Sequence, residues 1–433
     1  MPVDGPSEAT RRRLGHEPAL DGVRGIAVLL VVLWHYPSDI LERQFSWLQA
    51  GHLGVDLFFV LSGFLITALM LNEHTRDGAI SFRGFYRRRV FRLLPALFAF
   101  LAAHVIFANL TDIPTRGIFN PGTDGADQVA SILGAAFFVL NWLEEIGPGY
   151  QTSLGLAHLW SLSVEEQYYI IWPAVTVAML APRPAVNALA SAGASTAVVM
   201  AGHNYIWSES DDTQRWVTTV LVWSAVAGAL EIVRRSRHRS VWVLSIIATI
   251  VGATLLYRNG SYEGGPEAFR LYYGTLGRAD SLMIGAAFAF VWVEGWIPRR
   301  CPTPVSLAAW AFFVWAVVER SLGEPFFYEY GWTLVGIAGA LILWGALGAE
   351  ATIYGRVLSM SWLRGIGKVA YGLYLWHALV FIAVRHWWGD GSVLWKSILA
   401  IGITAAATGA SWFLLEKPLL AFKTARSRTT RPV

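Results

Sequence analysis

Two ionisable residues stand inside the first long apolar stretch of the sequence, where they could bind an anion and move a proton. Arg24 and His35 lie within residues 19–37, a stretch of the length that a membrane-spanning helix needs. Eleven residues separate them, so three helical turns place both on one face, roughly 16 Å apart along the axis. Imidazole titrates near neutral pH and suits general acid–base chemistry. The alternative is structural: an arginine that reaches the lipid headgroups and a buried, hydrogen-bonded histidine.

The next apolar run, at 53–71, contains a single acid, Asp56, and a Ser62–Gly63 pair. If the two runs are antiparallel neighbours, Asp56 lies at the membrane depth of His35. A carboxylate there could orient the imidazole and stabilise its protonated form, as acids do in hydrolytic triads. The structural alternative is a buried polar pair that locks two helices together.

An arginine cluster opens the third apolar run, at the end that we expect in the cytoplasm. Arg87, Arg88, Arg89 and Arg92 fall within six residues of the segment 83–96. Guanidinium groups bind phosphates through two parallel hydrogen bonds, which predicts a clamp for an acyl donor with a nucleotide head. Anchoring by the positive-inside rule is the alternative explanation.

Further ionisable or hydroxyl side chains occur in later apolar runs. Adjacent helical residues point about 100° apart, so Glu165 and Glu166 cannot both face one site, and one of them is expected to be structural. We expect Glu166 to join His35 and Asp56 as a catalytic residue. The other candidate site residues are Glu165, Ser163, Arg278, Asp280, Tyr371 and His377.

The composition indicates a polytopic membrane protein. The 433 residues are 55% hydrophobic and only 15% charged, with 21 Trp, and the mean hydropathy is +0.46. The sequence predicts an all-α transmembrane bundle of about 11–13 membrane segments over residues 19–420. Apolar runs of spanning length follow at 93–110, 165–181, 186–207, 216–233, 241–257, 272–293, 304–320, 331–348, 366–384 and 394–415.

The distribution of Lys and Arg predicts the orientation. A polar tail at 1–18 and a basic tail at 421–433 should both be cytoplasmic, in a multi-pass protein of the cell membrane. Counting crossings leaves the shorter run at 128–143 as one too many, so we expect it to form a re-entrant element with 144–164. The single cysteine excludes an internal disulfide, and no metal site or nucleic-acid partner is predicted.

With these motifs in order, the chain resembles the acyltransferase-3 family of integral-membrane acyltransferases. The matching segments are the Arg24–His35 spacing, VDLFFVLSGFLIT, the Arg89–Arg92 pair, WSLSVEEQYY, RADSLMIG and YGLYLWH. The resemblance implies transfer of an acyl group from cytosolic acyl-CoA, with acetyl-CoA the favoured donor, to a hydroxyl of an extracytoplasmic glycan, glycolipid or cell-wall component. It makes His35 the essential histidine and Arg24 its motif partner, and it links Arg89 and Arg92 to donor binding. We expect Arg24 and Arg88 to contribute to donor binding as well.

Two other functions fit parts of the same pattern. The acceptor could instead be a small metabolite, such as a macrolide or a sugar. A proton-coupled transporter or flippase would also use intramembrane His, Asp and Arg, but the sequence contains no repeat of the kind that suggests inverted halves. Because intramembrane ionisable groups are costly, a scaffold without chemistry is the least favoured reading.

Overall fold

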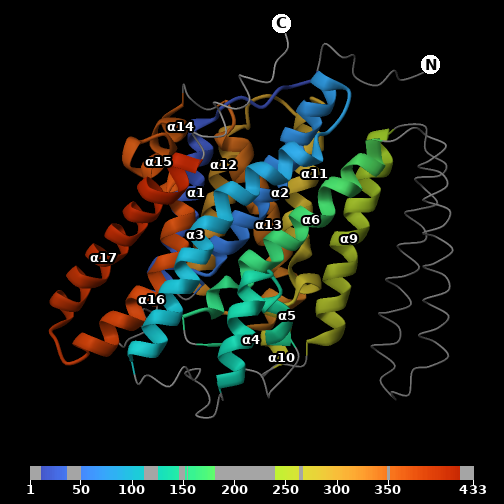
Figure 1. Ribbon diagram of the computed structural model, residues 1–433. Helices are drawn as coiled ribbons and strands as arrows, with labels where there is room; N and C mark the ends of the chain where they lie inside the picture. Colours follow the sequence, from blue (N-terminus) through green and yellow to red (C-terminus); the bar gives the residue numbers. More distant parts are fainter. Residues whose placement is uncertain are drawn as a thin grey trace, which may run out of the picture. The chain divides into compact units, whose positions relative to one another are not determined.

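Every regular element that the structure describes is a helix, as the sequence predicts (Figure 1). The structure is a computed structural model, and it describes residues 11–36, 50–111, 125–145, 152–153, 155–180, 239–262, 267–348 and 352–419. The chain divides into two units. Unit 1 comprises Met1–Leu20, Asp56–Ile80 and Glu165–Val357, and unit 2 comprises Asp21–Val55, Ser81–Val164 and Leu358–Val433.

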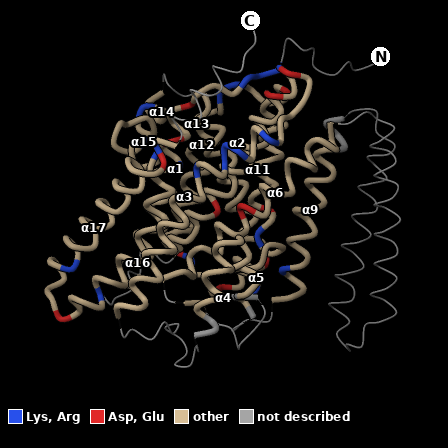
Figure 2. The backbone as a smooth tube through the Cα atoms, viewed as in Figure 1, with Lys and Arg blue, Asp and Glu red and all other residues tan. Residues whose placement is uncertain are grey.

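Six helices of the described residues are long and apolar enough to cross a membrane, and a bent pair of helices would make seven. Charged residues are sparse along the backbone tube (Figure 2), and the chain is a multi-pass membrane protein. The bent pair is α15 (Ser361–Lys368) and α16 (Ala370–Trp388), which meet at 73°. The six are α1 (Pro18–Tyr36), α2 (Leu53–Asp77), α3 (Phe82–Leu110), α9 (Arg239–Ser261), α11 (Thr275–Val293) and α17 (Val393–Ala410), which continues into a π-helical turn, η5 (Ser411–Glu416).

The prediction of 11–13 segments is larger than this count, which covers only the described residues. Three of the predicted runs form helices that are too polar or too short to qualify: α6 (Trp160–Leu180) carries two glutamates, while α12 (Thr303–Glu319) and α13 (Trp332–Ala346) have 17 and 15 residues. Two more predicted runs, 186–207 and 216–233, lie outside the described residues, as does the predicted tail at 421–433.

The run at 128–143 does not form one continuous helix. It is divided between α4 (Gly125–Ala136) and α5 (Leu140–Glu145), with Phe138 between them at a positive φ of 58°. A helix of 12 residues is about 18 Å long, shorter than the hydrocarbon core of about 30 Å. The re-entrant element stays a prediction, because residues 146–151 and 154 are outside the described residues. The remaining short helices are η3 (Ala157–Leu159), α10 (Glu267–Tyr273), η4 (Phe327–Gly331) and α14 (Ile353–Leu358).

In unit 1, neighbouring helices pack in the order α9, α11, α13 and α12 (Figure 1). Helix α2 crosses α11 with the two backbones in contact, because glycine stands at both contact points. A Cβ on Gly63 would lie 2.0 Å from the carbonyl oxygen of Leu282, and one on Gly285 would lie 2.1 Å from that of Val60. Small residues allow this approach in membrane bundles.

Replacing Gly285 with alanine should therefore push α2 and α11 apart. We expect a loss of about 1–3 kcal/mol in the free energy of unfolding, the usual cost of overpacking. Gly252 in α9 is the matched control, since a Cβ there meets nothing within 4 Å and alanine favours the helix by up to about 1 kcal/mol. Melting in detergent measures both variants, and equal midpoints for the two would contradict the close crossing.

Part of the predicted N-terminal tail is fixed along the end of α11 in unit 1. The Arg12 backbone N–H donates to the carbonyl of Val293 at 2.8 Å, and its guanidinium donates to the carbonyl of Ile297 at 2.5 Å. Arg11 forms an ion pair with Glu294 at 3.3 Å. These residues are thus part of the folded unit.

In unit 2, glycines hold the first helix against the segment around α15. A Cβ on Gly22 would lie 1.8 Å from the carbonyl oxygen of Leu358, and one on Gly367 would lie 1.8 Å from that of Asp21. The other end of α1 packs on an apolar cluster: Val32 and Tyr36 contact Val380, Phe381, Val384 and Ala400 of α16 and α17. Both ends of α1 are therefore fixed within the unit.

Candidate active site

The candidate base, His35, lies in the last turn of α1, as the first apolar run predicts. Its side chain is half-buried, and Nδ1 lies 2.9 Å from the backbone carbonyl oxygen of Val31, one turn earlier. A carbonyl oxygen can only accept a hydrogen bond, so this contact places the ring proton on Nδ1. In the neutral ring, Nε2 then carries the lone pair that a general base needs.

A second histidine, His377 of α16, lies directly beside His35. Its Nε2 is 3.4 Å from Nδ1 of His35, and the ring centroids are 5.1 Å apart. The side chain of His377 is fully buried. The structure thus brings together two of the candidates that the sequence identifies, one near each end of the chain.

A third histidine, His158 of η3, packs against His377 and was missed by the sequence analysis. Its ring centroid lies 5.2 Å from that of His377. The hydroxyl of Tyr374 donates to the His158 backbone carbonyl and also forms a hydrogen bond of 2.7 Å with Ser161. The sequence feature that could have identified His158 is its position among apolar residues, two residues before the WSLSVEE motif.

Hydrogen bonds to backbone carbonyls hold two other candidates of unit 2. The Tyr371 hydroxyl donates to the backbone carbonyl of Leu93 at 2.9 Å and so joins α16 to α3. The Ser163 hydroxyl donates to the carbonyl of Leu159, one turn earlier, at 3.2 Å. Both contacts are of the kind that stabilises helix packing or helix ends.

The candidate anion-binding residues also belong to unit 2. Arg24 forms an ion pair of 2.8 Å with Asp21, three residues earlier on α1. Helix α3 begins after Ser81, whose hydroxyl caps the N–H of Gly84 at 3.1 Å. In the arginine cluster of α3, Arg87, Arg88 and Arg92 are exposed and Arg89 is half-buried. Exposed guanidinium groups form a surface that attracts anions.

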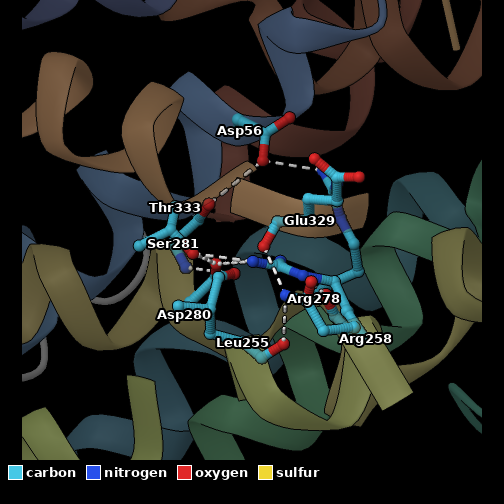
Figure 3. A network of polar contacts seen from close by, with 10 residues as sticks. Asp56, Leu255, Arg258, Arg278, Asp280, Ser281, Glu329 and Thr333 are labelled. Atoms are coloured by element: carbon cyan, nitrogen blue, oxygen red, sulfur yellow. Dashed lines mark hydrogen bonds and ion pairs between the residues drawn. The ribbon is translucent and has the colours of Figure 1, made fainter. Parts of the chain in front are cut away.

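The remaining candidates lie in unit 1, where Asp56 and Arg278 form a buried ion pair of 2.7 Å (Figure 3). The hydroxyl of Ser281 donates to the same carboxylate oxygen at 3.0 Å. The guanidinium of Arg278 stacks 3.7 Å above the ring of Trp332. Asp56, which the sequence suggests as the group that orients His35, therefore uses Oδ1 to hold an arginine, and a catalytic role for it stays a prediction.

Asp280 takes part in a second buried ion pair close to the first (Figure 3). Its Oδ2 lies 2.8 Å from Nη2 of Arg258 and accepts a hydrogen bond of 2.6 Å from Thr333. Arg258 is fully buried and was also missed. Arg258 directly follows the apolar run at 241–257, which is where an arginine that anchors a helix at the lipid headgroups would stand. The residues after it, 259–267, are acidic or neutral, so the positive-inside rule does not expect an arginine at this end of the run.

The adjacent glutamates of α6 behave differently from each other, as their helical positions require. Glu165 is partly exposed, and its Oε1 accepts hydrogen bonds from the hydroxyls of Ser62 and Tyr169. Glu166 is buried. Ser62 thus joins α2 to α6 while its neighbour Gly63 allows the crossing with α11, so both residues of the Ser–Gly pair have a structural use.

No group of three or more His, Cys, Asp or Glu side chains in the described ranges is arranged to hold a metal ion.

Comparison with known proteins agrees with this architecture. The sequence profile of a family described as "Acyltransferase domain" (Acyl_transf_3) matches residues 17–416. The chain belongs to this acyltransferase-3 family of membrane O-acyltransferases. No solved structure matches the chain.

Its relatives include proteins named for acetyl transfer to the cell wall. "Putative peptidoglycan O-acetyltransferase YrhL" of Bacillus subtilis (strain 168) is 29% identical over 93% of this chain and 54% of its own length. "Peptidoglycan O-acetyltransferase OatA" of Listeria monocytogenes is 27% identical over 95% of this chain and 57% of its own length. The chain therefore spans little more than half the length of these relatives.

Proposed function

We propose that this protein transfers an acetyl or other short acyl group from cytosolic acyl-CoA to a hydroxyl of an extracytoplasmic glycan, with peptidoglycan as the first acceptor to test. The observation that carries the proposal is the His35 imidazole, whose Nδ1 is held on a backbone carbonyl and whose Nε2 is the basic nitrogen. His35 lies within the residues that match the acyltransferase family. The acceptor is suggested by the names of the relatives.

The reaction needs one base and no net proton uptake. Nε2 of His35 takes the proton of the acceptor hydroxyl, so an O–H bond breaks and an N–H bond forms. The acceptor oxygen then bonds to the thioester carbonyl carbon, the C–S bond breaks, and the CoA thiolate takes the proton back from the imidazolium. The products are the acyl ester and free CoA, and His35 is again neutral.

The donor would be held by its phosphates. The arginines of α3 would contact the nucleotide head, and the long, thin pantetheine arm would carry the thioester to His35. The protein would then have no need to move the charged head across the membrane.

Release of free CoA from acetyl-CoA and longer acyl-CoAs by the purified protein tests the proposal. The assay is run with and without peptidoglycan precursors or a membrane glycolipid extract, and mass spectrometry reads the acceptor. CoA release that depends on the acceptor, with an acetyl mass shift on the glycan, is expected. A shift confined to small metabolites would reassign the acceptor, and no release with any donor would overturn the proposal in favour of a transport function.

Replacing Arg89 and Arg92 together with alanine should weaken donor binding more than turnover. We expect the KM for acyl-CoA to rise roughly 10-fold or more with a smaller change in kcat, because charge-assisted contacts to the donor's phosphates are lost. The control removes the same charge elsewhere, at the exposed pair Arg299 and Arg300. An equal effect of both double variants, or an unchanged donor KM in the first, would show that α3 is not the phosphate clamp.

A further inference from the structure

The side chain of His377 has a defined proton arrangement, which follows from its surroundings. Its Nδ1 lies 2.7 Å from the backbone carbonyl oxygen of Tyr374 and 3.2 Å from that of Leu373. Carbonyl oxygens only accept, so Nδ1 must carry a proton. A neutral imidazole has one N–H, and Nε2 of His377 is therefore an acceptor.

That acceptor points at the one nitrogen of His35 that must be a donor. His35 Nδ1 carries its proton because it faces the carbonyl of Val31 at 2.9 Å, and Nε2 of His377 is 3.4 Å from the same atom. The direction of the contact is thus fixed from both sides: His35 donates and His377 accepts. The proton is shared between a carbonyl on its own helix and a nitrogen on another helix.

We propose that His377 is a positioning residue that stabilises the imidazolium form of His35 during acyl transfer. This inference rests on the proposed function of the same site. When Nε2 of His35 takes the hydroxyl proton, its Nδ1–H becomes a stronger donor, and the lone pair of His377 faces the developing charge. A hydrogen bond to a charged group is stronger than one between neutral groups. The neutral imidazole of His377 thus does what a carboxylate does in a hydrolytic triad.

Burial makes this arrangement effective. His377 is fully buried and its ring is in contact with Phe381, at 5.8 Å between centroids, and with His158 on another side. A fixed dipole acts more strongly where water is excluded than in solvent. Two backbone carbonyls hold the ring, so little reorganisation is needed when His35 becomes charged.

Two substitutions separate this role from simple packing. His377→Gln keeps a side-chain oxygen that can accept from His35, whereas His377→Leu keeps the volume and has no acceptor. We expect His377→Leu to lower kcat between roughly 10- and 100-fold, the loss of one charge-assisted hydrogen bond. His377→Gln should recover most of that loss, and KM for both substrates should change little in either variant.

The control is His386→Leu, which changes the same residue type on the same helix at an exposed position. It should leave kcat and the melting temperature unchanged. A second readout needs no activity: ¹⁵N NMR of histidine-labelled protein should show His35 with its proton on Nδ1 and a perturbed Nδ1 resonance in His377→Leu.

Equal kcat values for the Gln and Leu variants would overturn the proposal, as would a His377→Leu variant with wild-type kcat. A His35 Nδ1 resonance that is unchanged by His377→Leu would also contradict it. If the wild-type protein releases no CoA but NMR shows the proton on His35 Nδ1 and its response to His377→Leu, the proposed function fails. The hydrogen bond from His35 to His377 is then still supported.

Discussion

Replacing His35 with alanine should reduce acyl transfer by roughly 10²–10⁴-fold while the protein folds normally. A positioned general base contributes about this factor, because without it the acceptor hydroxyl must lose its proton to water. The side chain of His35 is half-buried at the last turn of α1 and closes no tight glycine contact. Its removal should therefore affect turnover much more than stability. Acceptor-dependent CoA release measures the rate, and melting in detergent measures the fold.

Leu33→Ala is the matched control for His35→Ala. Leu33 lies two residues earlier on the same helix and 45% of its side chain is exposed, so its truncation removes apolar area without touching the histidines. We expect near wild-type kcat for this variant. A folded His35→Ala protein that turns over as fast as Leu33→Ala would show that another group is the base.

The positions of the helices were predictable because they depend on local sequence. The run at 331–348 forms α13 from Trp332 to Ala346, and the run at 304–320 forms α12 from Thr303 to Glu319. Apolar runs of this length can hydrogen-bond their backbones internally only as helices in a membrane. Whether each helix crosses was less predictable, since hydropathy marks an apolar run without fixing the length of the helix.

The partners of the candidate residues were not predictable, because periodicity fixes a face of one helix and says nothing of the helix that covers it. His35 and His377 are 342 positions apart. They meet because the end of α1 packs on the apolar cluster of α16 and α17. For Asp56, depth in the membrane suggested a histidine, whereas the glycine crossing of α2 and α11 brings Arg278 to it. The types of the side chains thus indicated the candidate chemistry, whereas the packing of the helices determined that His35 pairs with His377 and Asp56 with Arg278.

The buried ion pairs of unit 1 lead to the largest expected effect on stability. Asp280→Asn should destabilise the protein by about 3–5 kcal/mol, because it leaves the fully buried guanidinium of Arg258 without its counter-charge. Burying an unpaired charge costs more than the pair contributes, because the charge has left water without gaining a counter-charge. The free energy of unfolding in detergent, or the shift in melting temperature, measures the loss.

Two further variants show whether the cost comes from the unpaired charge. In the double variant Asp280→Asn with Arg258→Met, both charges are gone, so much of the lost stability should return. Arg320 and Glu324, also of unit 1, form a pair of 3.1 Å that is about one-third exposed, and Glu324→Gln should cost only about 0–1 kcal/mol.

If Asp280→Asn cost no more than Glu324→Gln, the pair between α9 and α11 would not be buried as the structure has it. If the double variant were less stable than Asp280→Asn alone, the Arg258 side chain would be needed for its packing and its hydrogen bonds to Gly277 and Thr333, with its charge a minor part.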